Sequence, residues 1–287
     1  MTGVKRAVFG SAILAAAWTF GGASAARADI IQWSDTSAGI RYGVDHREPA
    51  NPNDITKAII QLQHVHGWTY GQTFIGIDIL KGVDEDEEAA DDGNGPATEI
   101  YAVLREKLSS AKIFGAAYGG PIRDIGLTIG GDISYDDDVF HGRVRKFVVG
   151  PTIDFDVPGF LSIGLLLGTE HNYNGIVNTP VDFDPTWRIE TAWGLPVPVD
   201  IGVPVKFKGY MNIVGPKGTD GFGNDTVYEI LLESALMFDI GTLIGAPDAL
   251  QIGLGYQWWR NKYGNDPEIT TFGTEASVPQ FVAEFHF

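Results

Sequence analysis

The sequence predicts an all-β fold, a transmembrane antiparallel β-barrel of about 12 strands. Three observations predict it. Apolar and polar residues alternate over runs of about nine residues, which is the periodicity of a strand with two unlike faces. The polar face of these runs carries charges of both signs, and the connections between the runs alternate between long and short, as they do in membrane barrels.

The N-terminus has the pattern of a secretory signal peptide. A basic pair that begins at Lys5 precedes an apolar stretch over residues 7–20, which is short for a spanning helix of roughly 20 apolar residues. Small residues at A-x-A spacing follow, and we predict cleavage after Ala28. The chain is therefore divided into a signal peptide, residues 1–28, and a barrel, residues 29–287. A membrane anchor is the alternative for the N-terminal stretch.

The alternation is clearest over residues 72–79, 205–213 and 279–287. In the first of these runs, threonine and isoleucine share one face, while glutamine, glycine and aspartate share the other. Alternation of this kind indicates a strand with one apolar and one polar face. Similar strands are predicted over residues 36–46, 55–66, 72–81, 98–109, 122–134, 144–156, 160–172, 186–195, 203–214, 227–239, 249–261 and 278–287.

The connections between these strands form two sets. One set is longer, polar and acidic, and the other is generally shorter, which predicts long loops on one rim and short turns on the other. The exception is residues 109–121, a long connection where a short one is expected. It indicates either a misplaced strand or a segment that dips into the lumen.

Composition excludes some classes of function. The net charge is −17 and the sequence pI is about 4.6, which disfavours nucleic acid, because phosphate binding needs clustered Lys and Arg. An acidic surface instead suits cations, either at an outer surface or in a pore. The chain has no cysteine, so thiolate metal sites and cysteine nucleophiles are excluded.

The polar faces are expected to line a water-filled interior, because a dry sandwich core does not tolerate charges of both signs. The apolar faces, such as Leu161, Ile163, Leu165 and Leu167, are then expected to meet lipid. A soluble barrel or sandwich with the faces reversed is the alternative. The side chains assigned to the polar faces include Asp45, Lys57, Gln61, Asp78, Glu99, Lys107, Asp124, Lys146, Asp154, Glu284 and His286.

Aromatic residues support a membrane location. The closing strand ends in Phe287, with Phe281 and Phe285 on the same face, which is similar to the terminal signal of outer-membrane barrels. Other aromatic residues lie near predicted strand ends, where interfacial belts occur. They are Trp187, Trp193, Tyr256, Trp258, Trp259 and Tyr263.

Four segments occur in an order that points to a family. They are the strand over residues 146–156, the next strand's start at 161–164, the strand over 99–107 with an acidic loop before it, and the closing run 281–287. This order resembles the Tsx family of nucleoside-specific outer-membrane channels, over roughly residues 33–287.

The resemblance implies a passive channel in the cell outer membrane, with a narrow pore that holds nucleosides between aromatic rings and charged side chains. No cofactor is expected. The expected partners are a small-molecule solute, nucleosides included, and outer-membrane lipid and lipopolysaccharide. A chain of this size closes a barrel of about twelve strands alone, so a monomer is expected. The lumen residues suited to this role are Arg41, Tyr101, Arg105, Arg188, Glu190, Lys206, Lys208, Tyr210, Glu229 and Glu233.

Other functions remain open at this point. The barrel could pass other small solutes, cationic ones included, or it could be a non-conducting barrel with a structural or adhesive role. An enzyme is not predicted, because the only Ser–His pairs that can be drawn are Ser134 with His141 and Ser162 with His171, and G-x-S-x-G is absent.

Two further patterns have both a purely structural and a functional interpretation. The acidic run over residues 84–88, followed by Asp91 and Asp92, suits either a solvated flexible loop, which is favoured, or divalent cations. His64 and His66 have a spacing compatible with zinc, but no carboxylate partner is evident, and no metal site is predicted there.

Overall fold

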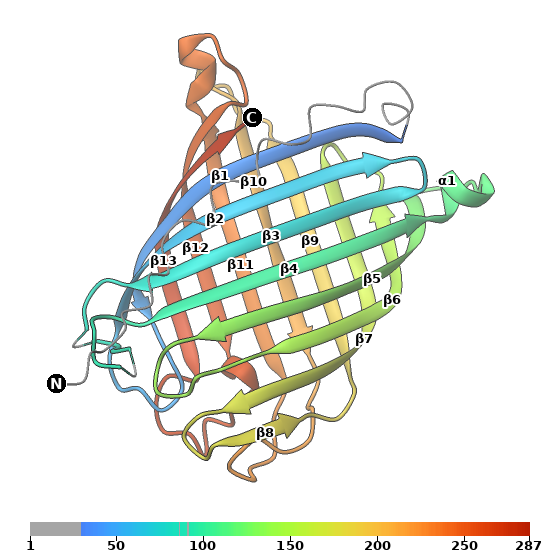
Figure 1. The fold of residues 1–287 in the computed structure, drawn as a ribbon. Helices are drawn as coiled ribbons and strands as arrows, with labels where there is room; N and C mark the ends of the chain where they lie inside the picture. Colours follow the sequence, from blue (N-terminus) through green and yellow to red (C-terminus); the bar gives the residue numbers. More distant parts are fainter. Residues whose placement is uncertain (1–29, 86, 91) are drawn as a thin grey trace, which may run out of the picture.

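The computed structural model describes residues 30–85, 87–90 and 92–287, so the predicted signal peptide lies outside the described residues. Strands dominate the described chain (Figure 1). They are β1 (Ile31–His46), β2 (Ile55–Trp68), β3 (Gly71–Gly82), β4 (Thr98–Ser109), β5 (Ile122–Asp136), β6 (Arg145–Phe155), β7 (Phe160–Asn174), β8 (Thr179–Asp182), β9 (Thr186–Val197), β10 (Val205–Val214), β11 (Glu229–Asp239), β12 (Leu250–Arg260) and β13 (Glu275–His286).

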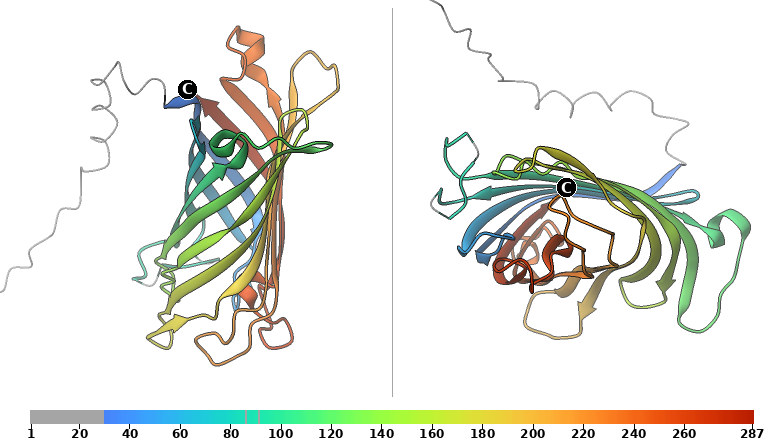
Figure 2. Two further views of the ribbon diagram at one scale, coloured as in Figure 1. Left: turned by 90° about the vertical axis from the view of Figure 1, so that its right-hand side faces the viewer. Right: turned by 90° about the horizontal axis from the view of Figure 1, so that it is seen from below.

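Twelve of these strands close into one antiparallel barrel. Each strand pairs with its neighbour in sequence, β1 pairs with β13, and β7 pairs with both β6 and β9. The short strand β8 only extends the end of β7 as a hairpin. Figure 2 shows that the closed barrel is flattened in cross-section. The predicted fold class is therefore confirmed, and each of the twelve predicted strands corresponds to a strand of the barrel.

The long connection over residues 110–121 contains neither a strand nor a lumen segment. It begins with the short helix α1 (Ser110–Phe114), whose first turn is capped by Ser109 and which ends at Gly115 with a positive φ of 66°. The side chain of Phe114 is 81% exposed, and the connection projects outward from the barrel rim (Figure 1). Both expectations for this segment are wrong.

The remaining helical segments are the 3₁₀ turns η1 (Ile240–Ile244) and η2 (Lys262–Gly264). No helix within the described residues is long and apolar enough to cross a membrane.

Apolar side chains cover the outside of the barrel, and polar ones lie inside. Ile60, Leu165 and Leu254 are 50%, 57% and 68% exposed, although each is a large aliphatic residue in mid-strand. Inward-facing Asp132 is 2% exposed. A soluble protein would bury the first group and expose the second, so the reversed, soluble alternative is wrong.

The interior is not uniformly polar. Ala235, Met237 and Val282 form a small apolar cluster on the inner face of β11 and β13. Ile59 and Val148 also face inward and are 1% and 0% exposed. These side chains fill part of the barrel cross-section and narrow the space between its walls.

The C-terminus closes the barrel against the first strand. The backbone N–H of Phe287 donates to the carbonyl of Thr36 at 2.9 Å, and the rings of Phe285 and Phe287 stack with centroids 6.0 Å apart. Phe281, Phe285 and Phe287 all face outward, as predicted from their spacing.

One predicted lumen residue faces the other way. Asp45 is exposed, whereas His46 is 3% exposed and faces inward. The reason is a register shift between Gly43 and His46, which inserts an extra residue into β1 and reverses the facing of its end.

We expect a charge on the lipid-facing surface to destabilise the barrel according to its depth. Leu165→Arg, near the middle of β7, should lower the free energy of unfolding by about 2–4 kcal/mol, whereas Leu161→Arg, beside a short turn, should cost about 0–1 kcal/mol. Urea unfolding of the barrel in lipid vesicles measures both values. Equal costs at the two positions would contradict a lipid-facing exterior.

Candidate functional site

An ion pair joins two parts of the barrel wall that are four strands apart. Arg105 of β4 donates to both carboxylate oxygens of Glu190 of β9, from Nε and Nη2, each at 2.8 Å. Strands β5, β6 and β7 lie between β4 and β9 in the sheet, so this bidentate pair crosses the interior as a chord. Both side chains point inward because alternate residues of a strand do, and the flattened, closed sheet brings the two walls within reach of each other (Figure 2).

Asp132 of β5 also contacts this pair. Asp132 is not among the lumen residues predicted from the sequence. Its carboxylate accepts from Arg105 at 2.6 Å and from the Tyr101 hydroxyl at 2.9 Å. Arg188 lies 3.9 Å from Asp132 and 3.1 Å from Glu190. We call Arg105, Asp132, Arg188 and Glu190 the four-charge cluster. Asp132 lies on the same face of β5 as Asp124, so the alternation of that strand could have identified it.

A second group of charges links β1, β3 and β11. Arg41 donates to Asp78 at 2.6 Å and also forms an ion pair with Glu233. Glu233 further accepts from Gln257 at 3.1 Å and from the Tyr210 hydroxyl at 3.4 Å. Because β12 and β13 separate β11 from β1 in the sheet, this group also spans the interior.

The other predicted lumen residues face inward but lie apart from these groups. Lys208 pairs with Glu284 across the inner face. Glu229 lies near the long-loop rim and accepts from the indole N–H of Trp259 at 2.8 Å. Lys206 lies near the opposite rim, at the start of β10, and no ion pair joins it to a described carboxylate. The contact with Glu229 places Trp259 inside the barrel, so its assignment to an outer aromatic belt is wrong.

A buried network of ion pairs connects the loops of the long-loop rim. Glu48, between β1 and β2, lies 2.8 Å from Lys57 and 2.7 Å from Lys262, and Glu88 lies 3.0 Å from Lys57. Glu87 accepts from the backbone N–H of Thr56 at 2.6 Å. The acidic segment over residues 84–88 is therefore anchored through Glu87 and Glu88, which corrects the favoured interpretation as a solvated flexible loop. Asp86 and Asp91 lie outside the described residues.

The surroundings of these rim carboxylates shift their pKa values in opposite directions. Burial by itself would raise the pKa of Glu48, but the ammonium groups of Lys262 and Lys57 outweigh it and hold that pKa at about 2. Burial raises the pKa of Asp138 to about 6, with help from the negative charges of Glu48 and Glu88. The rim therefore holds one firmly ionised carboxylate and one that takes up a proton in mildly acidic conditions.

The histidine pair and the serine–histidine pair considered for metal binding and catalysis do not form such sites in the described residues. His64 and His66 face outward and contact each other at 3.1 Å, and within the described residues no group of three or more His, Asp or Glu is arranged to hold a metal ion. Ser162 faces the interior, where it donates to Asp154, whereas His171 lies on the outer face of the same strand and contacts Asp182.

The interior around the charged groups is narrow. Arg41, Arg188 and Glu233 are 5–7% exposed. Beside the four-charge cluster, Glu170, Arg188 and Lys217 line a cavity of about 10 Å³, which is about the space for one water molecule. The amide of Gln280 also faces inward, and neither its nitrogen nor its oxygen has a hydrogen-bond partner among the described residues.

The closed sheet, the apolar exterior and the charged interior define a transmembrane β-barrel, because a closed barrel leaves no strand edge to be desolvated in lipid. No protein-family model matches the chain, and no curated protein matches it.

Three solved structures illustrate what the chain is similar to. The NanC porin aligns with 86% of this chain and 98% of its own, at 8% identity and a TM-score of 0.46. The translocator domain of the autotransporter NalP from Neisseria meningitidis aligns with 88% of each chain, at 9% identity and a TM-score of 0.41. OmpF of Salmonella typhi, in complex with daunomycin, aligns with 89% of this chain and 97% of its own, at 9% identity and a TM-score of 0.35.

Proposed function

We propose that this chain is an outer-membrane channel for the passive diffusion of small hydrophilic solutes. The observation that carries the proposal is the inner face, where charged and hydroxyl side chains of both signs follow the walls inside an apolar exterior. A buried interior made of ionised groups is costly for a purely structural barrel, but it suits a path through which water and polar solutes pass.

Nucleosides are the solute class that we infer. Tyr101 and Tyr210 place aromatic rings beside the two charged groups, and the Gln280 amide offers a free donor and a free acceptor. Such a set can stack against a base and satisfy ribose hydroxyls. The resemblance of the sequence to the Tsx family supports the same class.

Passage of a solute requires the ion pairs that cross the interior to separate. The pair between Arg105 and Glu190 lies between the walls, so the polar groups of a solute must take over the hydrogen bonds of this pair. This exchange favours solutes rich in hydroxyl and amide groups and predicts a small single-channel current.

The same geometry supports a location in the outer membrane. Apart from the connection that holds α1, the long loops lie on one rim, and the short turns lie on the rim where the described chain begins and ends (Figure 2). In outer-membrane barrels the long loops face the outside of the cell. The predicted signal peptide would supply the export that this location requires.

A non-conducting barrel is the second candidate function. The observation in its favour is the tight packing of the interior, where Asp132 is 2% exposed and Met237 is 0% exposed. A structural or adhesive barrel would keep this packing permanently.

Single-channel recording in a planar bilayer tests the proposal. Small current steps that nucleosides reduce in a concentration-dependent way would support the nucleoside channel. Steps that nucleosides do not affect would retain the channel and reject the solute class. Absence of current from a folded, heat-modifiable barrel would reject the channel and favour the second candidate.

Lys206 offers a clean test of conduction, because no ion pair with a described residue is lost when it is changed. Lys206→Glu should shift the reversal potential of a channel toward cation selectivity, since it changes the charge of the inner wall. Phe207→Leu, at the next residue and on the outer face, should leave the reversal potential unchanged. A reversal potential that Lys206→Glu leaves unchanged would indicate that the conducting path does not pass Lys206.

A further inference from the structure

Two arginines on the outer surface of the barrel lack a carboxylate partner among the described residues. Arg145 begins β6 and lies opposite Ile133 of β5 and His171 of β7. Arg143 precedes it by two residues and faces the same side. The other arginines of the described chain all have a carboxylate partner within ion-pair distance; they are Arg41, Arg47, Arg105, Arg123, Arg188 and Arg260.

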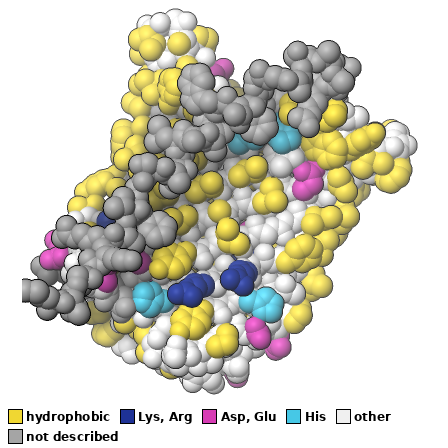
Figure 3. Space-filling view, viewed as in Figure 1, with side chains coloured by type: hydrophobic (Ala, Val, Ile, Leu, Met, Phe, Trp, Pro, Cys, Tyr) yellow, Lys and Arg dark blue, Asp and Glu magenta, His cyan; other side chains and the backbone are white. Residues whose placement is uncertain are grey.

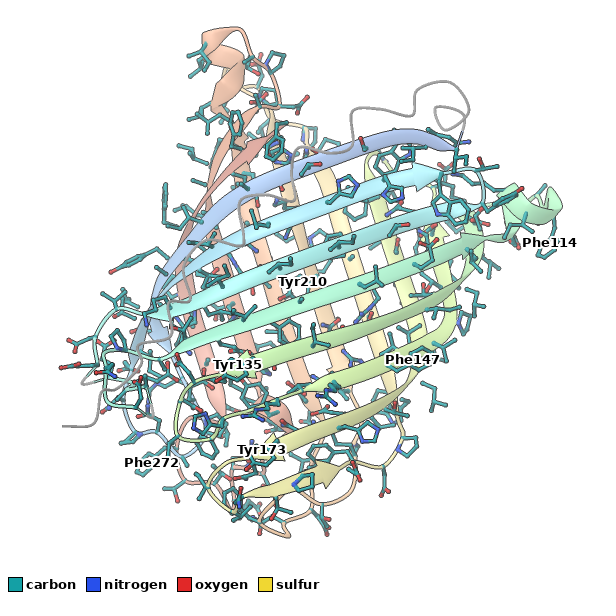
Figure 4. The ribbon with its side chains drawn as sticks, viewed as in Figure 1. Phe114, Tyr135, Phe147, Tyr173, Tyr210 and Phe272 are labelled. Atoms are coloured by element: carbon teal, nitrogen blue, oxygen red, sulfur yellow. The ribbon has the colours of Figure 1, made fainter. Side chains whose placement is uncertain are left out.

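Arg143 is held in place by aromatic rings. Its guanidinium carbon lies 5.8 Å from the ring centre of Tyr135 and 5.3 Å from that of Tyr173. Figure 4 shows both tyrosines on the same face of the barrel, on β5 and β7, with β6 between them. Cation–π contacts on two sides fix the side chain without neutralising its charge, so its hydrogen-bond donors remain available to an anion.

The two arginines lie at the edge of the apolar band. Phe147, the next outward residue of β6, is 51% exposed, and the strand rise places it only about 7 Å from Arg145. Ile133, opposite Arg145, is 62% exposed. Figure 3 shows basic side chains gathered on this face, below apolar ones, toward the long-loop rim. This is the depth at which the headgroups of a bilayer begin.

The charge of this patch contrasts with the rest of the chain. The net charge of the chain is −17, yet the patch holds two guanidinium groups that no described carboxylate neutralises. The carboxylate of Asp182 also lies at the patch, but it contacts His171 at 2.6 Å. Guanidinium groups bind phosphate through two parallel hydrogen bonds, and they do so best near low-dielectric surroundings.

We propose that Arg143 and Arg145 form a binding site for the phosphate group of an outer-leaflet glycolipid, lipopolysaccharide, whose acyl chains lie on the adjoining apolar band. The proposal rests on the outer-membrane location with the long loops outward, and it is independent of transport. Its binding measurement therefore fails or succeeds separately from any measurement of current.

The test is binding of diphosphoryl lipid A to the folded barrel in detergent, with EDTA present to remove divalent cations. We expect Arg143→Gln/Arg145→Gln to raise the Kd by roughly tenfold or more, as the loss of charge-assisted hydrogen bonds predicts. Arg145→Gln alone should give part of the effect, because the clamp around Arg143 remains. Arg260→Gln is the matched control, since Arg260 lies on the same rim but is paired with Glu275, and its Kd should stay unchanged. Heat modifiability on a gel confirms that each variant is folded.

Three outcomes would overturn the proposal. The double variant could bind lipid A with the Kd of the parent barrel. Dephosphorylated lipid A could bind as tightly as the diphosphoryl form, in which case the acyl chains alone are recognised. Arg260→Gln could lose as much affinity as the double variant, in which case the effect is one of overall charge.

Discussion

Replacing Arg105 with methionine should lower the free energy of unfolding by about 3–5 kcal/mol, because it leaves two buried carboxylates that share one remaining guanidinium. Arg105 supplies both hydrogen bonds of the bidentate pair with Glu190 and the 2.6 Å contact with Asp132. After the substitution, Arg188 alone faces both acids. Urea unfolding in lipid vesicles measures the change.

A double variant and a control variant distinguish the loss of this ion pair from a general loss of charge. In Arg105→Met/Glu190→Met, the pair is removed as a unit, so most of the lost stability should return and the single-channel current should exceed that of the parent. Arg123→Met removes an exposed ion pair of 3.6 Å and should cost less than about 1 kcal/mol. A stable Arg105→Met variant would show that the chord across the interior does not form.

Replacing Glu48 with glutamine should destabilise the long-loop rim by about 3–5 kcal/mol at neutral pH, since it removes the shared partner of two buried ammonium groups. Lys57 keeps its contact with Glu88 at 3.0 Å, whereas among the described residues Lys262 keeps only backbone and aromatic partners. The free energy of unfolding of the parent and of Glu48→Gln gives the difference.

The pH dependence of that difference has a defined sign. The pKa of Glu48 in the folded barrel, about 2, lies below its ordinary value of 4.5. The stabilisation is therefore fully present above pH 4.5 and is lost as the pH falls from there toward 2. Glu268→Gln, in an exposed loop, should show no such dependence. A difference that is constant down to pH 2 would contradict the ion network.

Asp138 acts in the opposite direction at the same rim. Because burial raises its pKa to about 6, the folded rim takes up a proton more readily than the unfolded chain does, and acidification from neutral pH toward pH 5 should strengthen the rim before the loss of the Glu48 charge weakens it. The two carboxylates thus make opposite contributions to the stability of the rim as the pH falls.

The strand pattern could be predicted because its cause is local. Alternate residues of a strand point to opposite faces whatever the partner strand, so runs such as 72–79 and 205–213 determine both the strands and the side that meets lipid. The inward facing of Arg41, Arg105, Glu190 and Glu233 follows from the same rule.

Contacts between distant strands could not be predicted in this way. Periodicity places Arg105 and Glu190 on inner faces, but it does not say that a wall four strands away lies within reach. That distance depends on the flattening and closure of the whole sheet. For the same reason, the ion pairs of Glu48 could not be predicted, because its two partners, Lys57 and Lys262, lie far apart in the chain.

The two remaining errors have different causes, of which one is a local irregularity. The extra residue between Gly43 and His46 turns Asp45 outward, and no composition signal marks it. Trp259 lies inside by the same alternation, because β12 is regular and 259 shares the inner face with Gln257; its indole N–H then donates to Glu229. The sequence by itself determined the number of strands, their faces and the polarity of each surface, since these depend on a repeat of two residues. Only the tertiary structure decided which charges meet across the interior and which, like Arg143 and Arg145, face outward with no carboxylate partner in the described part of the chain, because those contacts depend on how twelve strands close into one barrel.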